Sequence, residues 1–142
     1  MEFAEAKRML VENNLTCVIF GDEIVYTSSE RGIRPLLRLI DEKKDYTKLC
    51  AVDKVIGKAA AFAYVILKIQ KVHAFVISES AKKVLEKHKI VVTYDTLVEY
   101  IRNRAGDGRC PMESAVWDIE SSEEALFAIR RKLDKLQAGD KG

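Results

Sequence analysis

The spacing of apolar and polar positions divides the chain into helices and strands. Apolar residues recur every three or four positions in residues 2–13, which is the pattern of a helix that docks one face on a core. Similar spacing predicts helices over 79–89 and 95–104, and a last helix opened by Ser121 and Glu124, which stand at capping-box spacing. The chain is therefore expected to be rich in amphipathic helices.

Two prolines predict short helices in the segments between these. Proline lacks the backbone N–H that stays unpaired in the first turn of a helix, so it fits that position well. Pro35 predicts a helix over 35–44, and Pro111 predicts one over 112–118.

Short runs of β-branched and aromatic residues predict strands. Two such runs lie within residues 15–27 and are joined by Gly21 and Asp22, where glycine is expected to supply the positive φ of a tight turn. This pattern predicts an antiparallel hairpin. Further buried strands are predicted at 72–78 and 90–94.

The middle of the chain carries its most apolar segment. Residues 51–69 are predicted to form a helix buried on most sides, because Lys58 is followed by no charged residue until Lys68. Helices and strands then alternate, which predicts parallel strands joined by right-handed crossovers. The expected fold class is a three-layer α/β/α domain over 1–142, with a frayed tail at 138–142. Its mixed sheet has four or five strands and starts with the antiparallel hairpin, and the pattern does not locate the fifth strand.

Composition and charge exclude several classes of function. With 24 Lys+Arg against 22 Asp+Glu the net charge is only +2, which gives no global electrostatic case for nucleic acid or an anionic membrane. Three widely spaced cysteines form no disulfide framework, and the amphipathic start of the chain is unlike a signal peptide. The apolar run 59–67 is far shorter than the ~20 residues of a membrane span. We expect a soluble cytoplasmic protein.

Polar residues gather at the start of the predicted 51–69 helix. Asp53, Lys54, Gly57 and Lys58 would share one side of its first two turns. Lysines are unfavourable at the positive end of a helix unless an anion or a carboxylate lies opposite. The free N–H groups, two ammonium groups and a glycine that permits close approach therefore predict a cradle for phosphate or carboxylate. The alternative is that the lysines only pair with Asp53 or with acids of neighbouring loops.

A catalytic version of this site assigns three roles. Asp53 would act as a general acid or base, Lys54 or Lys58 would neutralise developing negative charge, and Cys110 would attack as a nucleophile. Arg109 next to Cys110, and the helix start that follows, both favour the thiolate and extend the binding surface. The alternative is an inert loop cysteine, because no histidine is placed by the sequence to act as its base.

Metal binding has no support in the sequence. His73 stands inside a predicted strand and His88 at a helix end, and there is no Cys-x-x-Cys or His-Glu-x-x-His motif. We predict neither a metal site nor a cofactor.

The order of elements resembles that of a known superfamily. A hairpin, a buried helix, a strand, a helix and a second strand over about residues 15–100 resemble cytidine-deaminase-like proteins. More narrowly, "AVDKVIGKAAA" with the later "GRCPME" is similar to a small uncharacterised prokaryotic family, a domain of unknown function regarded as a divergent branch of that fold. In true deaminases a His/Cys-x-Glu motif opens the buried helix and Pro-Cys-x-x-Cys opens the next one, and together they hold zinc. Here "AVDK" and "SESAKK" stand at those places, so the resemblance implies a branch without zinc.

The resemblance also implies where a ligand would bind. The cleft of that fold lies where the two helix starts meet at strand ends, and fold analogy alone carries this expectation. It would gather Asp53, Lys54, Lys58, Ser78 and Ser80. We therefore predict a small anionic ligand, with nucleotide-like molecules among the candidates, at the start of the buried helix. The alternative from another class is a non-catalytic interaction module or a homo-oligomeric scaffold.

Overall fold

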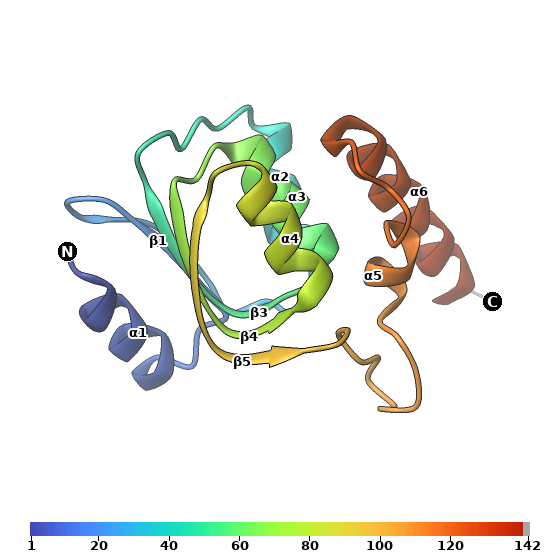
Figure 1. The fold of residues 1–142 in the computed structure, drawn as a ribbon, viewed down its shortest axis with the longest axis horizontal. Helices are drawn as coiled ribbons and strands as arrows, with labels where there is room; N and C mark the ends of the chain where they lie inside the picture. Colours follow the sequence, from blue (N-terminus) through green and yellow to red (C-terminus); the bar gives the residue numbers. More distant parts are fainter. Residues whose placement is uncertain (141–142) are drawn as a thin grey trace.

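A computed structural model describes residues 1–140 and folds them into a five-stranded mixed sheet with helices on both faces (Figure 1). No helix within this range is long and apolar enough to cross a membrane. The elements, in chain order, are α1 Phe3–Glu12, β1 Cys17–Phe20, β2 Ile24–Ser28, α2 Arg34–Asp41, β3 Cys50–Ile56, α3 Lys58–Leu67, β4 Lys71–Ser78, α4 Glu79–Lys87, β5 Val91–Val98, α5 Pro111–Ala115 and α6 Ser122–Asp140.

The sheet has the order β2-β1-β3-β4-β5 and confirms the predicted fold class. β1 is antiparallel to β2 and to β3, whereas β3, β4 and β5 run parallel. The hairpin is present, but the expected positive φ at Gly21 is wrong, since the positive-φ glycines are Gly32 and Gly106. A Cβ at position 21 would lie 2.7 Å from Leu49 Cδ2, so a larger residue there would require the Leu49 side chain to shift.

The central strand of the sheet lies inside the segment predicted as one long helix. Residues 50–56 form β3, and the helix α3 begins only at Lys58, so the predicted helix 51–69 is wrong over its first turns. A strand buried between two layers reads as a nearly continuous apolar run rather than as an alternation. Here Ala51, Val52 and Ile56 are all inaccessible to solvent, and the run merges with the apolar helix that follows. β3 is the fifth strand that the sequence pattern did not locate.

A further predicted element differs from the structure. The helix predicted at 95–104 is wrong, because residues 95–98 continue the edge strand β5 and residues 99–104 are not helical. The frayed tail predicted at 138–142 stays a prediction, and α6 continues to Asp140. Residues 141 and 142 lie outside the part of the chain that the structure describes.

Helices cover the sheet unequally. α1 packs on one face against β1 and β3, with Ala6 and Leu10 buried against Val18 and Val52. α2, α3 and α4 cover the other face, and α5 and α6 lie outside α3, as Figure 1 shows. α3 is therefore enclosed by the sheet and by other helices, which confirms the prediction of a helix buried on most sides. The start of α3 lies at the carboxyl end of β3, beside the cavity described next.

Candidate functional site

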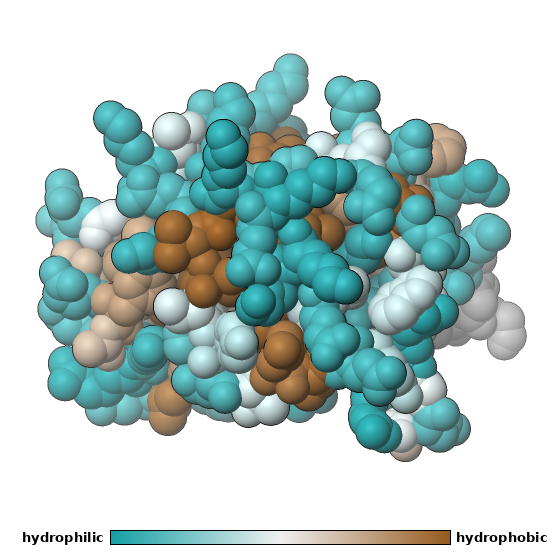
Figure 2. Space-filling model, viewed as in Figure 1, coloured by the Kyte–Doolittle hydropathy of each residue, from teal (hydrophilic) through white to brown (hydrophobic). Residues whose placement is uncertain are grey.

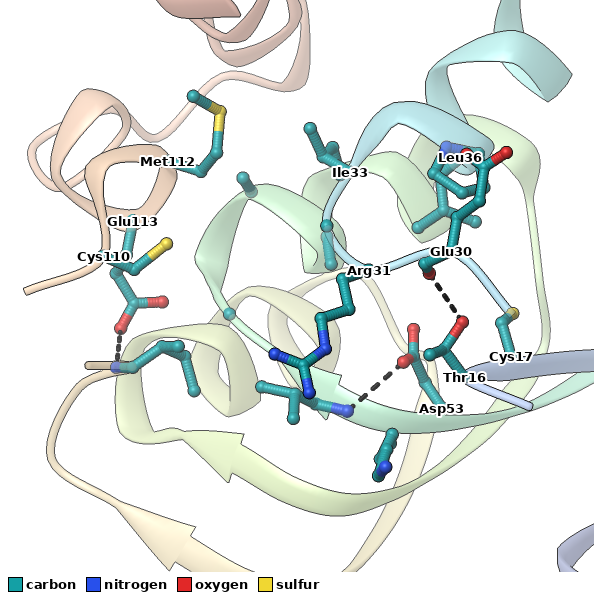
Figure 3. A pocket seen from close by; sticks show the side chains of 18 of the residues that line it. Thr16, Cys17, Glu30, Arg31, Ile33, Leu36, Asp53, Cys110, Met112 and Glu113 are labelled. Carbon is teal, nitrogen blue, oxygen red and sulfur yellow. Dashed lines mark hydrogen bonds between the residues drawn. The ribbon is translucent and has the colours of Figure 1, made fainter. Parts of the chain in front are cut away.

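A cavity of about 490 Å³ lies at the carboxyl end of β3. Its walls come from the start of β1, the end of β3, the segment that leads into α2, and the segments 101–104 and 110–113 (Figure 3). Ligands of open α/β sheets bind at this edge, outside the carboxyl ends of the parallel strands. The volume is within the range of cavities that hold small molecules.

Asp53 lies in the wall of the cavity on β3 and is 9% exposed. Its Oδ2 accepts a hydrogen bond of 2.5 Å from the Tyr64 hydroxyl of α3, and its Oδ1 accepts a longer one of 3.3 Å from the Val55 N–H. Burial raises the pKa of Asp53 to about 6, although these hydrogen bonds act in the opposite direction. A carboxyl group with this pKa can exchange a proton near neutral pH.

Cys17 of β1 completes a buried polar cluster with Asp53 and Tyr64. Its Sγ lies 3.3 Å from the Tyr64 hydroxyl. Burial, and then the nearby Asp53 carboxylate, raise the pKa of the Cys17 thiol far above its ordinary value. Tyr64 has a raised pKa for the same two reasons, burial first and Asp53 second. The thiol and the phenol therefore stay protonated, and Asp53 is the only member of this cluster that titrates near neutral pH.

Four cationic residues are among those that line the same cavity. They are Arg31, Lys54, Arg102 and Arg104. All four are exposed, and no carboxylate of the described chain lies within ion-pairing distance of any of them. In Figure 3 the side chain of Arg31 reaches into the cavity from the segment before α2, and its guanidinium group lies between Asp53 on one side and Cys110 and Glu113 on the other. Glu30, Asp53 and Glu113 line the cavity as well, so its wall carries both signs of charge, and the cations without an ion pair attract anions.

The start of α3 holds an anion already, and that anion belongs to the chain itself. Glu113 of α5 is 1% exposed, and its Oε2 accepts hydrogen bonds from the Lys58 N–H at 2.6 Å and the Ser78 hydroxyl at 3.0 Å. Its Oε1 accepts one from the Ile101 N–H at 2.9 Å. Gly57 leaves room for this contact, because a Cβ there would lie 2.7 Å from Glu113 Oε2. The carboxylate fastens the starts of α3 and α4 to the segment after β5.

Lys58 points to the C-terminal part of the chain. Its side chain is buried, and its Nζ donates a 2.7 Å hydrogen bond to the Trp117 carbonyl and lies 3.9 Å from the exposed Glu120 carboxylate. Lys58 therefore pairs with groups of the chain, as the alternative prediction for the lysines expected, and does not face an external anion.

The structure divides the predicted site residues into two groups. Asp53, Lys54, Gly57 and Cys110 all line the cavity. Lys58, Ser78, Ser80 and Arg109 are not among its lining residues.

The second group has contacts elsewhere in the fold. Ser78 caps α4 by accepting a hydrogen bond from the Ala81 N–H, and the Ser80 hydroxyl lies 3.3 Å from that of Ser78. Arg109 stacks on the Trp117 ring at 3.9 Å from its centroid. These contacts hold the local structure and leave the cavity to other residues.

Cys110 and Asp53 lie on opposite sides of the cavity, as Figure 3 shows. Cys110 is half-buried and precedes α5, and its backbone N–H donates to the Ile101 carbonyl at 2.7 Å. Among the described residues that line the cavity there is no histidine, so none of them offers the thiol an imidazole base.

The residues between the two helix starts do not fit zinc. One carboxylate and two serine hydroxyls lie there, whereas protein zinc sites are built from several thiolate, imidazole or carboxylate ligands. Across the described part of the chain, no group of three or more His, Cys, Asp or Glu side chains is arranged to hold a metal ion.

Fold and site together define a mixed α/β protein with a charged cavity at the carboxyl end of its central strand. The chain belongs to the family "TM1506: Domain of unknown function (DUF1893)", whose model matches residues 5–133. This finding confirms the predicted domain-of-unknown-function family. The fold is similar to the crystal structure of a DUF1893 family protein (TM1506) from Thermotoga maritima, with a TM-score of 0.84 and 25% identity over 95% of this chain and 92% of that one. No curated protein matches the chain.

Sequence reasoning missed Glu113, Arg31, Arg102 and Arg104. Their positions depend on how segments far apart in the sequence meet, which no local pattern encodes. One signal was present: the unfavourable positive end of α3 required an anion, and Glu113 is the acid of the quoted "GRCPME" segment.

Proposed function

We propose that this protein binds a small molecule with an anionic group in the cavity at the end of β3. The observation that carries the proposal is the set of four cationic side chains around that cavity without a carboxylate partner in the described chain. Gathering like charges is unfavourable unless a counter-charge arrives, and a phosphate or carboxylate supplies it.

The contacts of Glu113 support this cavity over the start of α3 as the binding place. The N–H of Lys58 and the hydroxyl of Ser78 already donate to a buried carboxylate, so an external anion would have to displace it. Arg31 and Lys54 face no such competitor. The proposed ligand contacts are therefore Arg31, Lys54 and Arg102, with Gly57 and Cys110 in the wall.

A panel of phosphorylated and carboxylated metabolites tests the proposal in a thermal-shift screen, followed by calorimetry for the compounds that raise the melting temperature. We expect at least one compound to bind wild type and to lose roughly 10-fold or more in affinity in Arg31→Ala and in Lys54→Ala, because each removes a charge-assisted hydrogen bond. Lys83→Ala is the matched control, since Lys83 is exposed on α4 away from the cavity. A panel without any binder, or equal losses in the control, contradicts the proposal.

A catalytic role for the site rests on Asp53. Its buried carboxyl, with a pKa of about 6, supports proton transfer to or from a ligand held in the cavity. Cys110 on the opposite wall is the nucleophile of this version, and Lys54 neutralises negative charge in place of Lys58. Once a binder is known, turnover that Asp53→Asn abolishes and Cys110→Ser leaves intact would support acid–base chemistry over covalent chemistry.

We further propose that the family is a divergent, zinc-less branch of the cytidine-deaminase-like fold. The order of hairpin, β3, α3, β4, α4 and β5 supports this, as does the carboxylate of Glu113 between the two helix starts where deaminases hold zinc. Elemental analysis of protein purified without chelator tests it, because stoichiometric zinc would contradict the proposal. The three cysteines are all free thiols, which supports a reducing, cytoplasmic setting.

The alternative, a homo-oligomeric scaffold, is favoured by the edge strand β5. Val91, Tyr94 and Leu97 of this strand are 52%, 38% and 39% exposed, and Figure 2 shows apolar surface where the end of β5 lies in the same view. An exposed apolar edge can pair with a second copy. Light scattering after size exclusion tests this, with Leu97→Lys expected to convert a dimer to a monomer; a monomeric wild type contradicts it.

A further inference from the structure

Asp53 is a buried carboxylate without a cationic partner. It is 9% exposed, and its two hydrogen bonds come from a phenol and a backbone N–H, both of them neutral. No lysine, arginine or histidine of the described chain lies within ion-pairing distance of it. Buried charges in proteins are normally paired, because removing an ion from water costs several kcal/mol by general estimates.

The surroundings of Asp53 leave only the cavity as the source of such a partner. Cys17 of β1 and Tyr64 of α3 enclose it from two sides with groups that stay protonated. Lys54 follows it on β3 and is exposed, and Arg31 reaches into the cavity from the segment before α2 (Figure 3). Neither cation comes within 4.0 Å of the Asp53 carboxylate. The Asp53 carboxylate can therefore accept further hydrogen bonds from a ligand in the cavity, because no cationic side chain of the described chain occupies that place.

We propose that the ligand of the cavity is a small zwitterion, an anionic molecule that also carries a positively charged nitrogen, and that Asp53 binds this nitrogen. This inference rests on the proposed function and names the chemical class of its ligand. The anionic end of the ligand contacts Arg31, Lys54 and Arg102, and the ammonium end contacts Asp53. Leu36, Ala59 and Met112 also line the cavity and offer apolar surface to the carbon chain that joins the two ends.

The wall composition supports a bipolar ligand over a simple anion. A simple anion would place negative charge beside the unpaired carboxylate of Asp53, and like charges at short range repel. A zwitterion places its anionic group near the cations of the wall and its ammonium group near the Asp53 carboxylate. Asp53 thus determines specificity, since it raises the affinity for ligands that carry a charged donor and lowers the affinity for matched molecules without one.

The titration of Asp53 gives a second, independent signature. Burial raises its pKa to about 6, so the carboxylate is largely ionised at pH 7.5 and largely protonated at pH 5. A protonated carboxyl no longer attracts an ammonium group. The preference for the zwitterion is therefore present above pH 6 and is lost as the pH falls through this value, whereas the primary amine of the ligand stays charged throughout.

Matched pairs of ligands test the inference by calorimetry at pH 7.5 and pH 5. The pairs are 2-aminoethyl and 2-hydroxyethyl phosphate, 3-aminopropyl and 3-hydroxypropyl phosphate, and 4-aminobutyrate and 4-hydroxybutyrate. In each pair the anion and the length are alike, and only the ammonium group differs. We expect the amine of at least one pair to bind roughly 10-fold or more tightly than its hydroxyl partner at pH 7.5, because hydrogen bonds between charged groups are worth about 1.5–3 kcal/mol. The ratio should approach one at pH 5.

Asp53→Asn keeps the shape of the side chain and removes its charge, so it should abolish the preference while the hydroxyl compounds still bind. Asp118→Asn, which changes an exposed carboxylate outside the cavity lining, should leave the ratio unchanged. If Asp53→Asn does not fold, the pH dependence of the wild-type protein alone decides. Equal affinities within every pair overturn the inference and leave the proposed anion site standing. Binding of no compound overturns both, as no anion is then held.

Discussion

Two buried carboxylates, Glu113 and Asp53, lie in the wall of the same cavity and have different surroundings. Glu113 accepts hydrogen bonds from three donors that belong to three segments of the chain. Asp53 accepts from two, one of them long at 3.3 Å, and desolvation is the largest influence on its pKa. Glu113 thus has its hydrogen-bonding capacity used by the fold, whereas Asp53 retains some for a ligand.

We propose that the difference separates a structural carboxylate, Glu113, from a functional one, Asp53. A buried charge that accepts hydrogen bonds from the chain's own donors stabilises the native state. A buried charge with too few donors lowers stability, but it can bind a ligand that supplies them.

Glu113→Ala should destabilise the protein most. It leaves the Lys58 N–H, the Ser78 hydroxyl and the Ile101 N–H without their acceptor in a buried place, and we expect a loss of roughly 3–4 kcal/mol in the free energy of unfolding. Urea unfolding followed by circular dichroism measures it. Glu123→Ala, at an exposed position on α6, is the control and should change stability by less than about 0.5 kcal/mol. Similar values for both variants would mean that Glu113 is not a structural anchor.

Asp53→Asn should stabilise the protein, in a manner that depends on pH. The folded state binds the Asp53 proton more tightly than the unfolded chain, because burial raises the pKa from its ordinary value of 3.8 to about 6. The stabilising contribution of this proton is complete below pH 3.8 and is lost as the pH rises through about 6. The variant should therefore gain roughly 2–3 kcal/mol over wild type between pH 4 and pH 7.5. A stability difference that stays constant over this range would show that Asp53 is not under-satisfied.

Gly57→Ala should disturb the structural carboxylate without touching the functional one. The added methyl group would lie 2.7 Å from Glu113 Oε2 and 3.1 Å from Ile101 Cγ1, and overpacking of this kind costs about 1–3 kcal/mol. Gly108→Ala is the matched control, since its nearest contact would be an ordinary 3.5 Å from Asn103 Nδ2. Thermal unfolding of the two variants compares them, and equal melting temperatures would argue against close packing at Gly57.

Arg31→Ala should have the smallest effect on stability. Its side chain is exposed and has no ion pair within the described residues, so we expect a change below about 0.5 kcal/mol together with the loss of anion binding. Unfolding and calorimetry on one preparation measure both quantities. A large loss of stability with unchanged binding would reverse the roles that we assign to the two kinds of residue.

The sequence predicted the fold better than it predicted the site. Periodicity located the hairpin, α3 and the β4-α4-β5 unit, because each has a spacing set by its own secondary structure. It failed at β3, whose apolar residues face both layers and so carry no strand alternation. It also failed at 95–104, where the edge strand β5 continues.

The site was predicted in part for a related reason. Asp53 and Lys54 were identified from the expectation that they share one side of a helix, although they stand at the end of a strand. They line a cavity all the same, because strand ends and helix starts meet at this edge of the sheet. The internal anion Glu113 stands 55 residues from Lys58 in the sequence, and only the tertiary fold brings the two together.

The most direct test of the account is where an anion binds. Titration of isotope-labelled protein with 2-aminoethyl phosphate, followed by nuclear magnetic resonance of the backbone amides, gives that location. We expect the largest shifts at Arg31, Asp53, Lys54 and Arg102, with Lys58 and Ser78 unchanged. Shifts centred on Lys58 and Ser78 would contradict the account, since they would show that the ligand replaces Glu113 at the start of α3.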